Sequence, residues 1–85
     1  MEIVYTPDFE KSYRKLPKRI RDLAIKKTGW FCVDPYDTRL KTHALQGKLF
    51  GKWAFSINFQ YRIIFKFVGT DRVLFLLTGT HNVYK

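Results

Sequence analysis

The chain has 85 residues, of which 46% are hydrophobic and 18% aromatic, so it is long enough for one dense domain and too apolar for a disordered segment. Its net charge is +9, and its apolar runs are far shorter than the ~20 residues that a membrane-spanning helix needs. A single cysteine, Cys32, excludes an intrachain disulfide and no secretory signal is visible, so we expect a cytoplasmic protein with Cys32 buried as a small hydrophobe.

The predicted elements begin with a short strand at residues 2–6. The segment T-P-D at residues 6–8 then supplies an N-cap, a proline at the first helical position and an acid in the first turn, so a helix starts there. Pro17 ends this amphipathic helix, and a second one begins at Pro17 or Lys18 and ends before Pro35. The inward face of the second helix is predicted to carry Ile20, Leu23, Ala24, Lys27 and Phe31.

The second half of the chain predicts a sheet. Turn signals without a period predict a loop at residues 34–46, and alternation of apolar and polar residues predicts strands from Lys48 onward. The elements are a strand at 48–57, a turn at 58–60, a strand at 61–68, a turn at 69–71 and a central strand at 72–78 that is apolar on both faces. A turn at Thr78-Gly79-Thr80 is expected to follow and to set His81 at the end of the sheet. The order β-α-α-β-β-β predicts one α+β domain over residues 1–85, with a two-helix hairpin on one face of an antiparallel meander that the first strand joins.

Positive charge is concentrated in this second half. Between Thr38 and Thr70 there is no Asp or Glu, and the cations are Arg39, Lys41, Lys48, Lys52, Arg62 and Lys66. Such a stretch favours an anionic partner, although a solvated basic surface explains the composition about equally well. Period 2 places Arg62 on one face with Lys66, and the matching face of the preceding strand carries Lys52 and Ser56.

Few kinds of catalytic site are compatible with the remaining residues. Two histidines and one cysteine without metal-binding spacing predict no metal site, and the glycines form no phosphate-binding loop, so no cofactor is expected. His43, Arg62 and His81 are each more often structural residues when taken singly. Together they fit metal-independent RNA cleavage, which needs a base for the 2′-hydroxyl, a cation for the phosphorane and an acid for the departing 5′-oxygen. Either histidine can serve as base or acid.

Three segments resemble the RelE/ParE superfamily of bacterial toxin-antitoxin toxins, on the RelE, YoeB and YafQ side: L-K-T-H-A-L-Q-G-K-L-F-G-K-W-A-F-S-I-N, Y-R-I-I-F and T-G-T-H-N-V-Y. The resemblance covers residues 40–84 closely and the helical hairpin loosely, and it implies the element order predicted above. It also implies mRNA cleavage in the ribosomal A site without a metal. The implied partners are a cognate antitoxin, mRNA and the ribosome with its 16S rRNA, with no membrane and no small-molecule cofactor.

By position, the resemblance implies that His43 is the general base, Arg62 binds the phosphate and His81 is the general acid, with the two histidine roles exchangeable. Tyr84 would support the substrate, whereas Asn82 stands where relatives often carry an aspartate or an aromatic residue. The lysines expected to bind RNA phosphates are Lys41, Lys48, Lys52 and Lys66.

Two alternatives to the nuclease remain. ParE-type members of the superfamily share the fold but inhibit DNA gyrase and lack the nuclease residues, so the presence of His43, Arg62 and His81 favours the nuclease. A decayed toxin that binds only its antitoxin or the ribosome is the third possibility, and an acidic amphipathic antitoxin segment would suit the basic surface.

Overall fold

The order of elements agrees with the prediction. In the computed structural model, the backbone of residues 1–84 and the side chains of residues 1–82 are described. The helices and strands are β1 (Glu2–Tyr5), α1 (Pro7–Arg14), α2 (Lys18–Val33), β2 (His43–Ala44), β3 (Trp53–Ser56), β4 (Tyr61–Val68) and β5 (Arg72–Thr80). Three short 3₁₀ turns complete the described chain: η1 (Thr38–Leu40), η2 (Gly47–Leu49) and η3 (His81–Tyr84). No helix in this part of the chain has the length and apolar character needed to cross a membrane.

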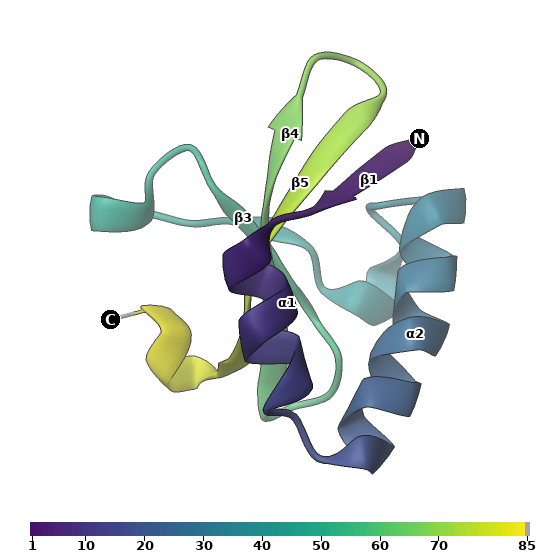
Figure 1. Ribbon diagram of the computed structural model, residues 1–85. Helices are drawn as coiled ribbons and strands as arrows, with labels where there is room; N and C mark the ends of the chain where they lie inside the picture. Colours follow the sequence, from purple (N-terminus) through teal and green to yellow (C-terminus); the bar gives the residue numbers. More distant parts are fainter. Residues whose placement is uncertain (85) are drawn as a thin grey trace.

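The five strands of the described chain form a single mixed sheet in the order β1-β5-β4-β3-β2. β1 pairs with β5 in parallel, and the other neighbours are antiparallel. Both helices pack against one face of this sheet (Figure 1), which confirms the predicted α+β arrangement. β5 has a neighbour on each side, as predicted for a strand that is apolar on both faces.

The first helix begins where the sequence predicts. Thr6 has an extended backbone, and its Oγ1 accepts a hydrogen bond from the Phe9 N–H at 3.2 Å, which satisfies one of the free donors at the helix N-terminus. The same hydroxyl donates to the Phe75 carbonyl at 2.8 Å, so the cap also fixes the helix to β5. Pro17 separates the two helices, and α2 begins at Lys18.

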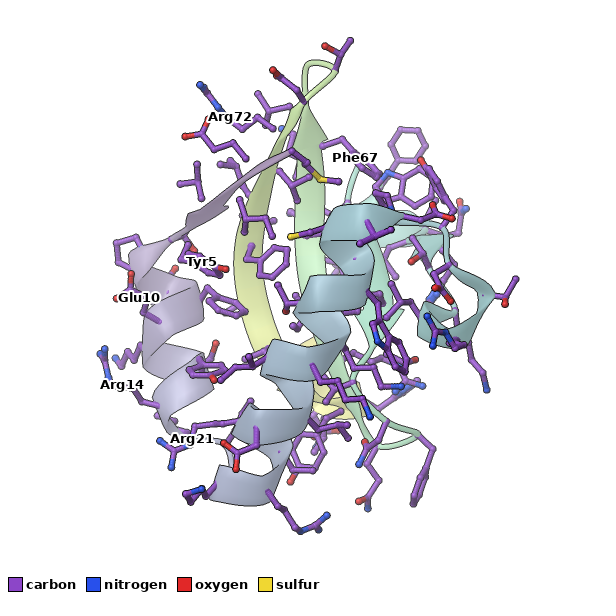
Figure 2. The ribbon with its side chains drawn as sticks, turned by 90° about the vertical axis from the view of Figure 1, so that its right-hand side faces the viewer. Tyr5, Glu10, Arg14, Arg21, Phe67 and Arg72 are labelled. Atoms are coloured by element: carbon purple, nitrogen blue, oxygen red, sulfur yellow. The ribbon has the colours of Figure 1, made fainter. Side chains whose placement is uncertain are left out.

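An aromatic cluster fills the space between the helices and the sheet. Phe31 of α2 is fully buried and stacks on Phe55 of β3, with ring centroids 4.8 Å apart. Its edge contacts with Phe65 and Phe75 have centroid distances of 4.9 and 5.7 Å. In Figure 2, α2 crosses in front of the strands that supply these rings. These ring contacts join α2 to the sheet.

Two predictions about the strands are wrong. The strand predicted from Lys48 begins only at Trp53, because Gly47 and Gly51 have positive φ angles of 66° and 92° that no extended strand accommodates. The residues before it, predicted as a plain loop, contain η1 and the two-residue strand β2.

Two further predictions fail near the ends of the elements. Thr78, Gly79 and Thr80 were expected to form a turn, but they extend β5 and pair with β4, which is long enough to hold them in register. Cys32 is exposed rather than buried, because the turn of α2 that directs Phe31 into the core directs the next side chain outward.

Candidate active site

The predicted site residues lie on or beside the face of the sheet that the helices do not cover, called the outer face below. It has a small apolar cluster of its own, in which Leu45, Ala54 and Ile64 are buried and Leu49 and Leu76 pack against them. Paired residues of neighbouring strands share a face. One row across the outer face is therefore His43, Ala54, Ile64 and Leu77, and the next row is Ser56, Arg62 and Gly79.

His43 presents its imidazole on the β2 side of the outer face. The side chain is exposed, and its Nδ1 lies 2.9 Å from the carbonyl oxygen of Lys41. A carbonyl oxygen only accepts hydrogen bonds, so Nδ1 carries the proton in this contact. In the neutral ring, Nε2 is then an acceptor that faces solvent. Lys41 ends η1 in the left-handed conformation, with φ 53°, and thereby turns its carbonyl toward the ring.

Arg62 stands in the middle of the outer face on β4. Its half-buried side chain has a single hydrogen bond within the described chain, from Nη1 to the Phe59 carbonyl at 3.3 Å, so most of the guanidinium fork is available to a ligand. Gly79 is directly opposite on β5 and has no side chain to crowd it. The backbone below is fixed, because the buried Thr78 donates its hydroxyl to the Arg62 carbonyl at 2.8 Å and its N–H to Ser12 Oγ of α1 at 3.0 Å.

His81 follows directly after β5 as the first residue of η3, and its side chain is exposed. The sequence prediction that it stands at the end of the sheet is confirmed. In Figure 1 the yellow η3 turn lies at the lower end of β5, beside α1. Tyr84 belongs to the same turn, but its side chain lies outside those that the structure describes.

The four lysines predicted to bind phosphate surround this face without anionic partners. The ion pairs within the described part of the chain are Lys18–Asp22, Arg39–Asp37 and Arg72–Glu2, and none involves these lysines or Arg62. Lys41, Lys48 and Lys66 are exposed, and Lys52 is half-buried just before β3. β2, β3 and β4 contribute no acid, so the potential of this face is positive.

Comparison with known proteins finds relatives by structure alone. No protein-family model matches the chain, and no curated protein does. A YoeB/ParE toxin from Agrobacterium tumefaciens superposes with a TM-score of 0.79 at 19% identity, over 95% of this chain and 99% of that one. YafQ from Escherichia coli strain BL21(DE3) gives 0.77 at 23% identity, over 98% and 96%. YafQ in the E. coli DinJ-YafQ toxin-antitoxin complex gives 0.73 at 23% identity, over 96% and 93%.

The chain has the fold of the RelE/YoeB/YafQ-type toxins. Coverage is nearly complete in both directions, so the likeness includes the helical hairpin, the sheet and the turn after the last strand. The sequence resemblance is thus confirmed at the level of fold, while the identities of 19–23% leave the chemistry of the individual side chains to be argued from this structure.

Within the RelE-type sheet, Arg62 and His81 come close together. Gly79 pairs with Arg62 and His81 lies two residues further along, just past the end of β5, so a strand spacing of ~4.8 Å and a rise of at most ~3.4 Å per residue put the two Cα atoms within about 8 Å of each other. The same spacings put the Cα atoms of His43 and Arg62 about 12 Å apart, with β3 between them. The sheet therefore brings the backbones of Arg62 and His81 near each other and leaves His43 on the far side of β3.

The structure groups Lys41, a predicted phosphate-binding lysine, with residues that the sequence did not assign to a site. A hollow of about 210 Å³ at the free edge of β3 is lined by Lys27, Arg39, Lys41, Ser56, Ile57, Asn58 and Phe59. Lys27 was predicted on the inward face of its helix, but it lies half-buried over the ring of Trp30, with Nζ 4.5 Å from the ring centroid. The hollow joins segments separated by 12 or more positions, so no local sequence signal reveals it. Among the described residues, no three His, Cys, Asp or Glu side chains gather to hold a metal ion.

Proposed function

We propose that this chain is the toxin of a toxin-antitoxin pair and an endoribonuclease that cuts mRNA on the ribosome without a metal. The observation that carries the proposal is the placement of Arg62, with most of its guanidinium uncommitted, beside His81 on a face without acids. A fixed guanidinium fork matches the paired oxygens of a phosphate, and an adjacent imidazole supplies proton transfer.

The reaction assigns one task to each group. His43 Nε2 takes the proton of the ribose 2′-hydroxyl, and the 2′-oxygen attacks the adjacent phosphorus. Arg62 hydrogen-bonds the phosphoryl oxygens, where negative charge develops in the transition state. His81, in its protonated form, gives its proton to the 5′-oxygen as the P–O5′ bond breaks. The products are a 2′,3′-cyclic phosphate and a 5′-hydroxyl, so atoms and protons balance without an added reagent.

The geometry distinguishes the two histidines. His81 adjoins Arg62 already, whereas His43 stands two strands away from Arg62 and must approach the 2′-hydroxyl within a hydrogen-bond distance of ~2.6–3.2 Å in the complex. The candidate site is small and does not itself select an RNA sequence, which supports a role for the ribosome in presenting the mRNA. mRNA held there in a bent conformation would bring the 2′-hydroxyl to His43. Tyr84 would support the substrate from η3.

The partners follow from the same surface. Unpaired Lys48, Lys52 and Lys66 would draw mRNA and 16S rRNA to the outer face by their charge. The DinJ-YafQ complex, whose toxin chain superposes on this one, supports a cognate antitoxin for this chain as well. An antitoxin with acidic residues suits the net charge of +9.

The test is mRNA cleavage in a translating extract, with cut sites mapped by primer extension. The wild-type chain is expected to arrest translation and to leave 5′-hydroxyl ends, whereas the double variant Arg62→Ala/His81→Ala leaves mRNA intact. Undiminished cutting by the double variant would show that the assignment is wrong. DNA breaks that require gyrase, in the presence of intact mRNA, would instead identify a ParE-type toxin.

A further inference from the structure

The hollow at the free edge of β3 is built to hold an anion. β2 pairs only with Trp53 and Ala54, so the edge of the chain from Ser56 to Phe59 is left without a neighbouring strand. Lys27 of α2 and the turn at Arg39 and Lys41 close the other side. The lining side chains with polar atoms are Lys27, Arg39, Lys41, Ser56 and Asn58, and none of them is an acid.

Several of these groups have hydrogen-bond donors to spare. Asn58 Oδ1 accepts from the N–H groups of Gln60 and Tyr61, at 2.9 and 2.8 Å, which leaves its amide N–H groups to point elsewhere. Lys27 and Lys41 form no ion pair within the described chain. An anion in the hollow would therefore meet two ammonium groups and an amide, with the Asp37 carboxylate near enough to Lys27 to interact with its charge.

Arg39 is held rigidly at the wall of this hollow. Its Nε and Nη2 donate to the two carboxylate oxygens of Asp37 at 3.0 and 2.8 Å, and its guanidinium carbon lies 3.6 Å from the centroid of the Trp30 ring. These hydrogen bonds lower the pKa of the Asp37 carboxyl to about 2, so the pair stays ionised in neutral solution. Nη1 remains available to a ligand, although Asp37 offsets part of the charge.

An exposed aromatic ring stands at the rim. Phe59 lines the hollow, and 84% of its surface is exposed, so its ring is open to a ligand. A phenyl ring beside cationic donors is the combination that binds single-stranded nucleic acid, where the base stacks on the ring and the phosphate meets the cations. An acidic peptide would use the cations but has no comparable use for the flat face of Phe59.

The hollow borders the candidate active site, although neither Arg62 nor His43 lines it. Arg62 donates to the carbonyl of Phe59, and His43 hydrogen-bonds the carbonyl of Lys41, so a residue of the hollow is the immediate partner of each. Ser56 pairs directly with Arg62 across β3 and β4. A strand of RNA that crosses Arg62 thus passes the hollow on leaving the β3 edge of the sheet.

We propose that this hollow is a second RNA site, in which Lys27 and Lys41 bind a backbone phosphate next to the one that is cut and Phe59 stacks on the adjoining base. The inference rests on the proposed function, since it extends the RNA path from the same site. The RNA is either the mRNA strand itself or an rRNA segment that abuts it, because both offer the same phosphate.

Binding of 2′-O-methyl RNA, which the enzyme cannot cut, tests the site. A fluorescent ten-nucleotide single strand and a short RNA hairpin are titrated separately by anisotropy at several salt concentrations. For single strands each lysine–phosphate contact adds ~0.7 to the slope of log affinity against log salt, so Lys27→Gln/Lys41→Gln should reduce the slope by about 1.4. Phe59→Ala should weaken binding about 5- to 150-fold with an unchanged slope.

The matched control is Lys11→Gln/Lys15→Gln, which removes two exposed cations from the α1 side of the molecule. It should leave the slope nearly unchanged, and unchanged melting temperatures show that all variants are folded. If Lys27→Gln/Lys41→Gln has a smaller salt slope than the wild type with the single strand, mRNA is the ligand. If its slope is smaller with the hairpin alone, rRNA is the ligand. Equal slopes for the wild type and Lys27→Gln/Lys41→Gln with both RNAs overturn the inference.

Two further outcomes keep the two proposals separate. If the wild-type chain cuts mRNA but the salt slopes of the wild type and Lys27→Gln/Lys41→Gln are equal, the second site is refuted and the proposed nuclease activity is not. Wild-type chain that binds RNA with the expected loss in the variant but cuts no mRNA supports the site and refutes the nuclease. If the variant loses binding only to a fluorescent polyglutamate peptide and keeps its RNA slope, the hollow is a protein-docking surface and the inference is wrong.

Discussion

Replacing Arg62 by lysine tests whether cleavage needs only the positive charge of this residue or also its planar guanidinium group. The substitution keeps one positive charge on the same position of β4, but it removes the planar group whose Nε and Nη2 are uncommitted in the structure. Hydrogen bonds to charged groups contribute ~1.5–3 kcal/mol each, so losing one of a pair in the transition state should slow cleavage about 10- to 150-fold. Arg62→Ala, which also loses the charge, should slow it by ~10²–10³-fold or more.

The assay is the initial rate of mRNA cleavage in a translating extract, compared at equal concentrations of folded protein. Arg72→Gln is the matched control, because Arg72 is an exposed cation at the opposite end of the neighbouring strand and its ion pair with Glu2 is a surface pair worth ~0–1 kcal/mol. The control should cut at the wild-type rate. The reasoning about the fork fails if Arg62→Lys cuts as fast as the wild type, or if lysine and alanine slow cleavage equally.

Three other predictions concern acid catalysis, the core and the Asp37 pair. His81→Gln should slow cleavage ~10²- to 10⁴-fold while the protein still binds its antitoxin, measured by co-purification; a wild-type rate would remove His81 from the mechanism. Phe31→Ala should lower the free energy of unfolding, measured by urea titration, by ~3–5 kcal/mol. Ile25→Ala, at a side chain that is 64% exposed, should lower it by much less. Equal losses in the two variants would contradict the assigned core. The pKa of Asp37 in the folded state is lowered to about 2 from an ordinary 3.8, so its contribution to stability is present above pH 3.8 and is lost as the pH falls toward 2. Asp37→Asn should therefore make the free energy of unfolding in urea less dependent on pH between these values. The same pH dependence in the variant would show that the Asp37 pair does not stabilise the fold.

Local chemistry explains the parts of the fold that the sequence predicts well. The Thr6 cap and the break at Pro17 depend on a few adjacent residues, so they can be read before any packing is known. Period 2 along β4 correctly separates Arg62 and Lys66 from the buried Ile63 and Phe65. The pairing of Arg62 with Ser56 follows as well, since a short turn at residues 58–60 fixes the register of the two strands.

Tertiary packing decides the parts that the sequence misses. β2 has two residues, too few to show a periodic pattern. It forms because Ala44 pairs with the edge of β3. The turn predicted at Gly79 fails because β4 is long enough to pair with it, which no local signal within T-G-T reports. Lys27 has helical spacing with the core residues, yet it stays near the surface. Its aliphatic stem lies against the ring of Trp30, and its ammonium group lies over the face of that ring.

The division of the sheet into two faces explains why a small domain can carry a strongly basic site. The face beneath the helices buries the aromatic cluster around Phe31, so the larger of the two apolar clusters lies away from the cations of the outer face. Those residues, Arg62 and Lys66 among them, are left with cations that nothing in the described chain neutralises, and like charges gathered on one surface repel one another. On the proposed function, an RNA strand and an acidic antitoxin would each relieve this repulsion and would compete for the outer face. Raising the salt concentration should therefore weaken both complexes, and a toxin variant with fewer cations on the outer face should lose affinity for both partners together.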